Sequence, residues 1–419
     1  MADRMFIAFG KYLKLVRGRR NMSLSDVVTL TKSYPEPVGK GYLSRVERGL
    51  ARIGFSKMVA LSRAYEISLD AFGEKLSLDL EVDELKNPPI TSGKTFGELT
   101  DAGTQFNQRG LKWHCYAVLR DALPLAGLDP LHAGYRTERE QVTRATLSHG
   151  IAARATGRYA LALVEFDFVR EHMEALNEET LPVVFQQSAI ARRHLGFIVE
   201  ANTLADRAIE LARQAPERRH LGDALETRAL FANQLGDYSS AIANYQAAFA
   251  AYKAVKNKVE CARTLNNLAQ TYFNLRRYKA ARRSLGAAER LAVELGADAL
   301  RARSRILLGE IEAIDGNPKE AAELWHDAIE IARRTRDTVV HFKAEFQLFK
   351  LSIEQGNLTA ANALGRRLNR MRPWISRSES EVAEFARLFA IYRKPKQRGV
   401  ASAQHERPAS RNSDSPNGL

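Results

Sequence analysis

Leu235-Gly236-Asp237-Tyr238-x-x-Ala241 decides the fold, because its pattern returns along the chain every 40 residues. A glycine or its replacement, followed five residues later by an alanine, occurs at Gly196/Ala201, Gly236/Ala241, Arg276/Ala281, Gly316/Ala321 and Gly356/Ala361. A fixed period of this size is typical of a solenoid of repeated supersecondary units. Glycine can take the left-handed turn that ends the first helix of a hairpin. We expect the alanine to lie where the second helix packs closest to the first, so the sequence predicts an all-α fold.

The repeat resembles the tetratricopeptide repeat in its small and aromatic positions. Leu265-x-x-Leu268-Ala269-x-x-Tyr272 is followed by Arg276-x-Tyr278-x-x-Ala281, and weaker copies in phase begin near Leu99 and Gly150. The resemblance implies a right-handed α-solenoid of about seven tetratricopeptide-like helical hairpins over residues 95–393, ending in a capping helix over Glu379–Tyr392. The period of 40 exceeds the usual 34, so we expect a longer second helix or loop.

Residues 1–76, ahead of the repeats, carry 14 Lys and Arg against 7 Asp and Glu. Their helical segments include Gly41-Tyr42-Leu43-Ser44-Arg45-Val46-Glu47-Arg48-Gly49, and then Met58-x-x-Leu61-x-x-Ala64-Tyr65-x-Ile67. This string resembles the lambda-repressor-like helix-turn-helix of the XRE/Cro family. The resemblance implies a small five-helix domain that binds double-stranded DNA.

The resemblance also implies that Gly41–Gly49 is the recognition helix and lies in the major groove. It assigns DNA contacts in and beside this helix to Lys40, Tyr42, Ser44, Arg45 and Arg48, and phosphate contacts to Arg19, Arg20, Arg52 and Lys57. We expect Leu43 and Val46 in the core, and Glu47 paired with an arginine of the first helix. The connection Thr31–Lys40 is longer than the family's usual tight turn. The alternative is a helical head used only for protein contacts.

In tetratricopeptide arrays the first helix of each hairpin lines a concave wall. On that wall we expect a peptide or partner site at Gln187, Asn233, Arg263, Asn266, Asn267, Gln270, Asn274 and Arg303. Side-chain amides both donate and accept, so they can hold an extended peptide backbone. Arg263 and Arg303 could receive a carboxylate. The alternative is that these residues form an ordinary solvated helix face.

The remaining composition defines the other segments and the compartment. Residues 77–85 are acidic and can form a helix, Asn87-Pro88-Pro89 would stop it, and we predict that residues 77–94 are a linker. Residues 394–419 have little to bury, so we predict a disordered tail. The net charge of +14 favours polyanionic partners. Two distant cysteines and the absence of a long apolar run lead us to expect a cytoplasmic protein without membrane association.

No motif of catalysis, metal binding or cofactor binding was found, so we expect neither an enzyme nor a cofactor. A DNA-reading head joined to such repeats resembles the RRNPP class of peptide-responsive regulators. The resemblance implies a homodimeric transcription regulator whose repeats bind a peptide or protein ligand. The alternative is an interaction scaffold with a head that binds DNA non-specifically or not at all.

Overall fold

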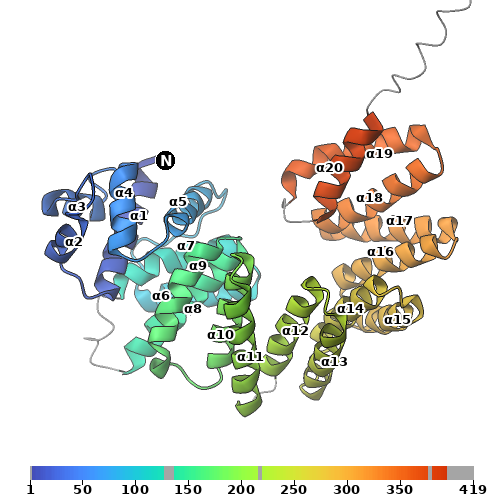
Figure 1. Ribbon diagram of the computed structural model, residues 1–419, viewed down its shortest axis with the longest axis horizontal. Helices are drawn as coiled ribbons and strands as arrows, with labels where there is room; N and C mark the ends of the chain where they lie inside the picture. Colours follow the sequence, from blue (N-terminus) through green and yellow to red (C-terminus); the bar gives the residue numbers. More distant parts are fainter. Residues whose placement is uncertain (1, 127–135, 216–218, 376–379, 394–419) are drawn as a thin grey trace, which may run out of the picture. The chain divides into compact units, whose positions relative to one another are not determined.

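The structure is a computed structural model that describes residues 2–126, 136–215, 219–375 and 380–393 (Figure 1). All regular secondary structure in these residues is helical. The chain divides into two compact units, Met1–Thr264 and Leu265–Leu419, each described on its own. The tail predicted over residues 394–419 lies outside the described residues. None of the described helices is long and apolar enough to cross a membrane.

Five helices form the head, as expected. They are α1 (Ala2–Arg19), α2 (Leu24–Thr31), α3 (Lys40–Glu47), α4 (Phe55–Ala64) and α5 (Leu69–Asp83). Serines start two of them: Ser23 and Asp26 form a capping box at α2, and the Ser68 hydroxyl accepts a hydrogen bond from the Ala71 amide at α5.

The long connection between α2 and α3 has a buried anchor at Val38. Val38 is fully buried, and its amide N–H donates to Oγ1 of Thr31 over 3.2 Å. Thr31 is itself fully buried at the end of α2. The additional residues therefore bulge outward, while the residue just before α3 is fixed to the core.

Seven helical hairpins follow the head, in agreement with the sequence pattern. They are α6 (Phe96–Gln108) with α7 (Lys112–Ala122), α8 (Arg136–Ala155) with α9 (Tyr159–Glu171), α10 (Leu181–His194) with α11 (Ile198–Gln214), α12 (Arg219–Gln234) with α13 (Tyr238–Ala254), α14 (Lys258–Asn274) with α15 (Tyr278–Glu294), α16 (Asp298–Ile314) with α17 (Pro318–Thr335), and α18 (Thr338–Glu354) with α19 (Leu358–Met371). In the hairpin of α14 and α15 both helices have 17 residues. The longer period thus comes from two helices of equal length rather than from a long loop.

The repeated turn positions behave as the pattern predicts. Gly196, Gly236, Gly316 and Gly356 have φ between 68° and 89°, the left-handed conformation that glycine adopts without strain. The alanines five residues after each turn are all fully buried. The last hairpin is covered by α20 (Ser380–Arg393), whose buried Phe385 packs edge-on against Phe342, Phe346 and Phe349. The expected capping helix is therefore present.

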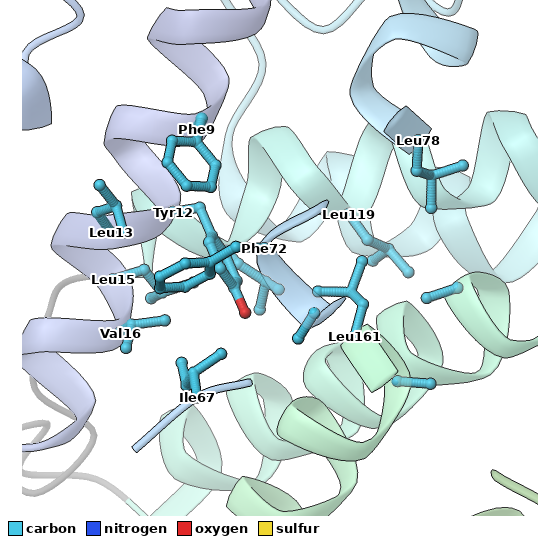
Figure 2. Packing of buried hydrophobic residues seen from close by; sticks show 14 of the residues in the cluster. Phe9, Tyr12, Leu13, Leu15, Val16, Ile67, Phe72, Leu78, Leu119 and Leu161 are labelled. Carbon is cyan, nitrogen blue, oxygen red and sulfur yellow. The ribbon is translucent and has the colours of Figure 1, made fainter. Parts of the chain in front are cut away.

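The head shares its hydrophobic core with the first hairpins. Figure 2 shows Phe72 and Leu78 of α5 beside Leu119 of α7 and Leu161 of α9, and these four side chains are fully buried or nearly so. The first residues of the predicted linker over 77–94 are helical, since residues 77–83 form the last turns of α5. An acidic helix is stable here because its apolar face, which includes Val82, packs on the repeats.

Candidate functional site

α3 is held to the head by its inner face. Leu43 and Val46 are buried, and Arg17 of α1 donates to Glu47, with Nε to Oε1 at 2.6 Å and Nη2 to Oε2 at 2.9 Å. This hydrogen bond raises the pKa of Arg17. α1 approaches closely, since a Cβ at Gly10 would lie 2.2 Å from the Val46 carbonyl oxygen. The expected roles of Leu43, Val46 and Glu47 are confirmed.

The outer face of α3 presents two uncommitted cations. Lys40, at the first position, and Arg45, near the end, are exposed, and neither side chain has a hydrogen bond or ion pair with another described residue. Arg48 is exposed as well, but its Nε donates to the Ser44 carbonyl oxygen over 3.2 Å. Lys40 and Arg45 are thus free to meet an anionic or hydrogen-bonding ligand.

Tyr42, Arg52 and Lys57 have contacts within the head. The Tyr42 hydroxyl donates to the Arg52 carbonyl oxygen over 2.7 Å, and the Lys57 ammonium lies 5.4 Å from the centre of the Tyr42 ring. Lys57 also pairs with Glu36 of the long loop over 3.2 Å. The guanidinium of Arg52 lies over the ring of Phe6 at 5.4 Å. These residues border α3, but part of their charge is already compensated.

Arg19 is a correction to the predicted phosphate contacts. Its side chain is 6% exposed and points into the repeats, where Nη1 meets Oε2 of Glu165 at 2.7 Å and Nη2 donates to Oγ1 of Thr146 at 3.0 Å. Its guanidinium also lies 4.1 Å above the Phe168 ring. A buried arginine that is paired in this way cannot reach DNA. Its neighbour Arg20 stays at the surface, paired with Glu66 over 2.8 Å.

Glu165 of α9 forms the centre of this head–repeat junction. Burial alone would raise its pKa, but Arg19 and His149 outweigh that effect and hold the pKa at about 2. Nδ1 of His149 lies 3.3 Å from Oε1 of Glu165, and the His149 ring stacks on Tyr116. The carboxylate is therefore ionised and joins α1 to the hairpin of α8 and α9.

A second buried polar group ties α5 to α7. Lys75 and Asp79, both on α5, pair over 2.5 Å with almost no exposed surface. Asp79 also accepts from the Tyr116 hydroxyl over 3.3 Å and lies 3.7 Å from Arg120 of α7. Sequence reasoning missed both junction groups. The available signal was charge at otherwise apolar positions of α5 and α9.

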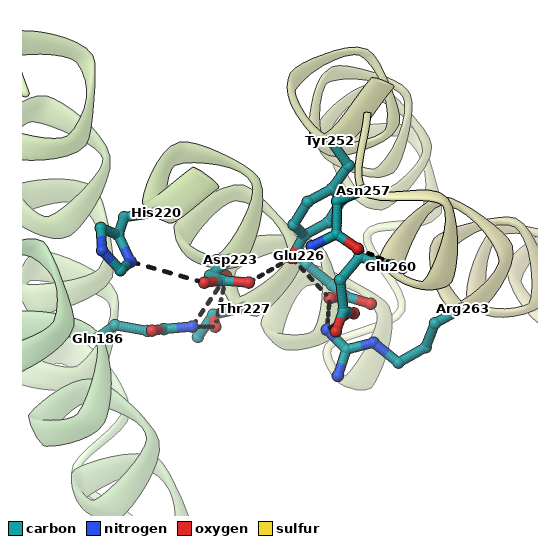
Figure 3. A network of polar contacts seen from close by, with 9 residues as sticks. All are labelled: Gln186, His220, Asp223, Glu226, Thr227, Tyr252, Asn257, Glu260 and Arg263. Carbon is teal, nitrogen blue, oxygen red and sulfur yellow. Dashed lines mark hydrogen bonds and ion pairs between the residues drawn. The ribbon is translucent and has the colours of Figure 1, made fainter. Parts of the chain in front are cut away.

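On the repeats, Arg263 is not the open carboxylate receptor that the sequence predicts. Its Nη2 pairs with Oε2 of Glu226 and with Oε2 of Glu260, both at 2.5 Å. Figure 3 shows these groups beside Tyr252, whose hydroxyl donates to Asp223 over 2.6 Å. The arginine completes a polar network that joins α12, α13 and the start of α14.

The predicted amides differ in their surroundings. In the second unit, Asn266 donates to the Leu300 carbonyl oxygen and accepts from Ser304, so it links α14 to α16. Gln270 and Asn274 are exposed, and the Gln270 side-chain amide donates to the Asn274 side-chain oxygen over 3.1 Å. Asn267 is half-buried, and its backbone carbonyl oxygen accepts from the Thr271 hydroxyl.

Several predicted repeat residues have side-chain groups without a partner among the described residues, including the buried Nε of Arg263. In the first unit, Gln187 of α10 and Asn233 of α12 each have a buried side-chain oxygen without a hydrogen-bond partner among the described residues. In the second unit, Arg303 of α16 is exposed and has no side-chain partner in the described part of the chain. Of the predicted set, Gln187, Asn233 and Arg263 belong to the first unit and the other residues to the second.

Comparisons with known proteins agree with this architecture. The tetratricopeptide repeat family model matches residues 221–293. No curated protein matches the sequence. Among solved structures, the chain is similar to the apo form of RapI, with 11% identity and a TM-score of 0.54 over 71% of this chain and 81% of that chain.

Two further solved structures cover more of the chain. One is a Rap protein complexed with Competence and Sporulation Factor, at 11% identity and a TM-score of 0.53 over 92% of this chain and all of that chain. The other is aspartyl phosphate phosphatase F from Bacillus subtilis, at 14% identity and a TM-score of 0.50 over 94% and 89%. At these identities the likeness shows the fold, a helical chain built on tetratricopeptide hairpins.

Proposed function

We propose that this chain is a sequence-specific DNA-binding transcriptional regulator, a homodimer whose repeats bind a peptide or protein ligand that modulates DNA binding. The proposal rests on the difference between the two faces of α3, one buried in the head and the other exposed and basic. Its inner face is fixed by Leu43, Val46 and the Arg17–Glu47 pair, while Lys40 and Arg45 stand exposed and unpaired. A rigid helix with free cations on its outer face fits the major groove.

The junction supports communication between ligand and DNA. Arg19–Glu165 and the Lys75–Asp79–Tyr116 group connect the head to α7 and α9 through buried side chains. A ligand that favours one arrangement of the first hairpins would therefore reorient α3, and in a dimer it would change the spacing of the two heads. A Rap protein of the same fold is complexed with Competence and Sporulation Factor, which supports ligand binding by the repeats.

Selection from a random double-stranded DNA pool with the full-length protein, near physiological salt, tests the proposal. We expect enrichment of a two-fold symmetric motif. Pools that stay unenriched, with and without extracts that supply candidate ligands, would contradict it.

The second candidate is an interaction scaffold with a head that binds DNA non-specifically or not at all. It is favoured by the internal pairing of Arg19 and Lys57, which leaves fewer cations beside α3. The scaffold predicts DNA affinity that falls steeply with salt and shows no sequence preference.

A further inference from the structure

The turn between α14 and α15 differs in sequence from the turns inside the other described hairpins, which have glycine at the left-handed position. It reads Leu275-Arg276-Arg277-Tyr278, whereas the preceding hairpin reads Leu235-Gly236-Asp237-Tyr238. Arg276 has φ 57°, so a side chain occupies the left-handed position that glycine takes in the neighbouring hairpins. Such a conformation is strained for any residue with a Cβ.

Arg277, which stands where the preceding hairpin has Asp237, also destabilises the turn. Asp237 caps α13 by accepting a hydrogen bond from the Ser240 amide over 3.1 Å, whereas Arg277 makes no side-chain cap at α15. A cation at a helix N-terminus is additionally disfavoured by the helix dipole. Both arginines thus make the turn less stable than Gly236 and Asp237 make the turn of the preceding hairpin. Residues that break local rules without a gain in folding are expected where a function requires them.

What the two arginines do create is a concentrated basic surface. With Lys279, Arg282 and Arg283 they line an open hollow of about 550 Å³ around Tyr278. Arg282 is paired with Glu312 and with Asp315. The other four cations are exposed and have no side-chain partner among the described residues. Like charges at this spacing repel one another until an anion compensates them.

We infer that this basic hollow, formed by Arg276, Arg277, Lys279 and Arg283, binds the phosphodiester backbone of nucleic acid. A polyanion is the occupant that exposed cations suit best, because it releases condensed counterions each time a phosphate is neutralised. A free phosphate ion gains little from exposed arginines, since each exposed ion pair is weak in water.

The charge of the lining favours a polyanion over an acidic protein, because the groups left free in the hollow are four exposed cations. Arginine and tyrosine also occur in protein interfaces, so competition with an acidic polypeptide is part of the test. Arginine forks match phosphate oxygens in pairs and track a backbone without reading bases. The contact therefore adds affinity and no sequence preference, and it is independent of α3.

The test variant, R276G/R277D in the full-length chain, gives the turn between α14 and α15 the Gly-Asp sequence of the preceding hairpin, Gly236-Asp237. The matched control, R366D/R370Q, makes the same change in net charge at two exposed arginines of α19. Binding of a random-sequence DNA duplex is measured across a salt series, together with thermal unfolding of each variant. We expect R276G/R277D to bind the duplex about tenfold more weakly than the control. We also expect the negative slope of log K against log salt to become shallower by about 2. The variant should also unfold at a higher temperature than the natural chain.

An affinity and a salt slope equal to those of the control would overturn the inference. So would polyglutamate displacing the duplex as well as a second DNA duplex does, since that would make an acidic protein the occupant. The outcome is separable from that of the proposed function. Substitution of Arg45 tests sequence preference, whereas R276G/R277D leaves α3 unchanged.

Discussion

If α3 reads DNA as proposed, Arg45 is the residue on which reading depends most, because it is exposed and has no partner among the described residues, while the inner face of α3 is buried in the head. We expect Arg45→Ala to weaken binding to the selected motif by about 10- to 100-fold, the range for one bidentate arginine–guanine contact. Lys14→Ala, at an exposed lysine of α1, is the control and should stay within about twofold. Titration of labelled duplexes measures both. Equal losses in the two variants would mean that α3 supplies only general charge.

Glu310 makes the stability of the second unit depend on pH. Burial raises its pKa to about 7, and Oε1 accepts a hydrogen bond from Nε2 of Gln347 over 2.9 Å. The unfolded value is about 4.3, so folding takes up a proton between these two values. The free energy of unfolding should therefore fall by about 1–3 kcal/mol as the pH rises from 4.5 to 7.5.

The variant Glu310→Gln isolates this effect, because its amide keeps a partner for Gln347. We expect it to remove that part of the slope and to be more stable than the natural chain at pH 8. Urea unfolding at pH 5 and pH 8 measures the difference. An unchanged pH slope in the variant would show that Glu310 is ionised throughout.

At the scale of elements, the end of α1 is joined to α9 by the buried ion pair between Arg19 and Glu165. The adjacent Arg20 forms an exposed ion pair with Glu66. Arg19→Gln leaves the Glu165 carboxylate buried beside a single imidazole, which should cost about 3 kcal/mol of unfolding free energy. Arg20→Gln breaks only the exposed pair with Glu66 and should cost less than about 0.5 kcal/mol. Chemical denaturation compares the two variants, and similar costs would argue against a structural role for the junction.

The long loop before α3 gives a second prediction at this scale. Thr31→Val keeps the shape of the side chain but removes the acceptor for the buried Val38 amide. We expect a loss of about 1–2 kcal/mol from the unsatisfied donor. Thr29→Val, at an exposed position of the same helix, should change the stability by less than about 0.5 kcal/mol. Equal stability of both variants would show that the loop does not depend on this anchor.

The elements could be predicted from the sequence because their signal is local and repeated. The period of 40 placed the turns and their buried alanines, and the apolar spacing placed Leu43 and Val46 inside. Ion pairs between residues that are distant in sequence left no local or repeated pattern from which they could be predicted. Arg19 and Arg20 are adjacent basic residues, and only the docking of α1 on α9 determines which of them is buried against Glu165.

At the scale of the molecule, residues 1–76 are not separated from the first helical hairpins. The predicted boundary rested on composition, yet Leu78 and Val82 beyond it are buried, and Met1–Thr264 form one compact unit. The charged residues at the end of α5 indicate only that one face of this helix is exposed to water. They do not indicate whether its opposite face packs on the first hairpins.

A shared core predicts that the head cannot fold without the first hairpins. In a fragment of residues 1–94, Leu78 and one side of Phe72 lose the cover of α7 and α9, and Asp79 keeps Lys75 but loses Tyr116 and Arg120. Exposed apolar area and the loss of two partners of a buried ion pair both oppose folding. We expect this fragment to show no cooperative thermal transition by circular dichroism, whereas residues 1–257, which keep α6–α13, melt cooperatively. Cooperative melting of fragment 1–94 at the temperature of the longer fragment would mean an autonomous head, and a ligand on the repeats could not then reorient α3 through the junction.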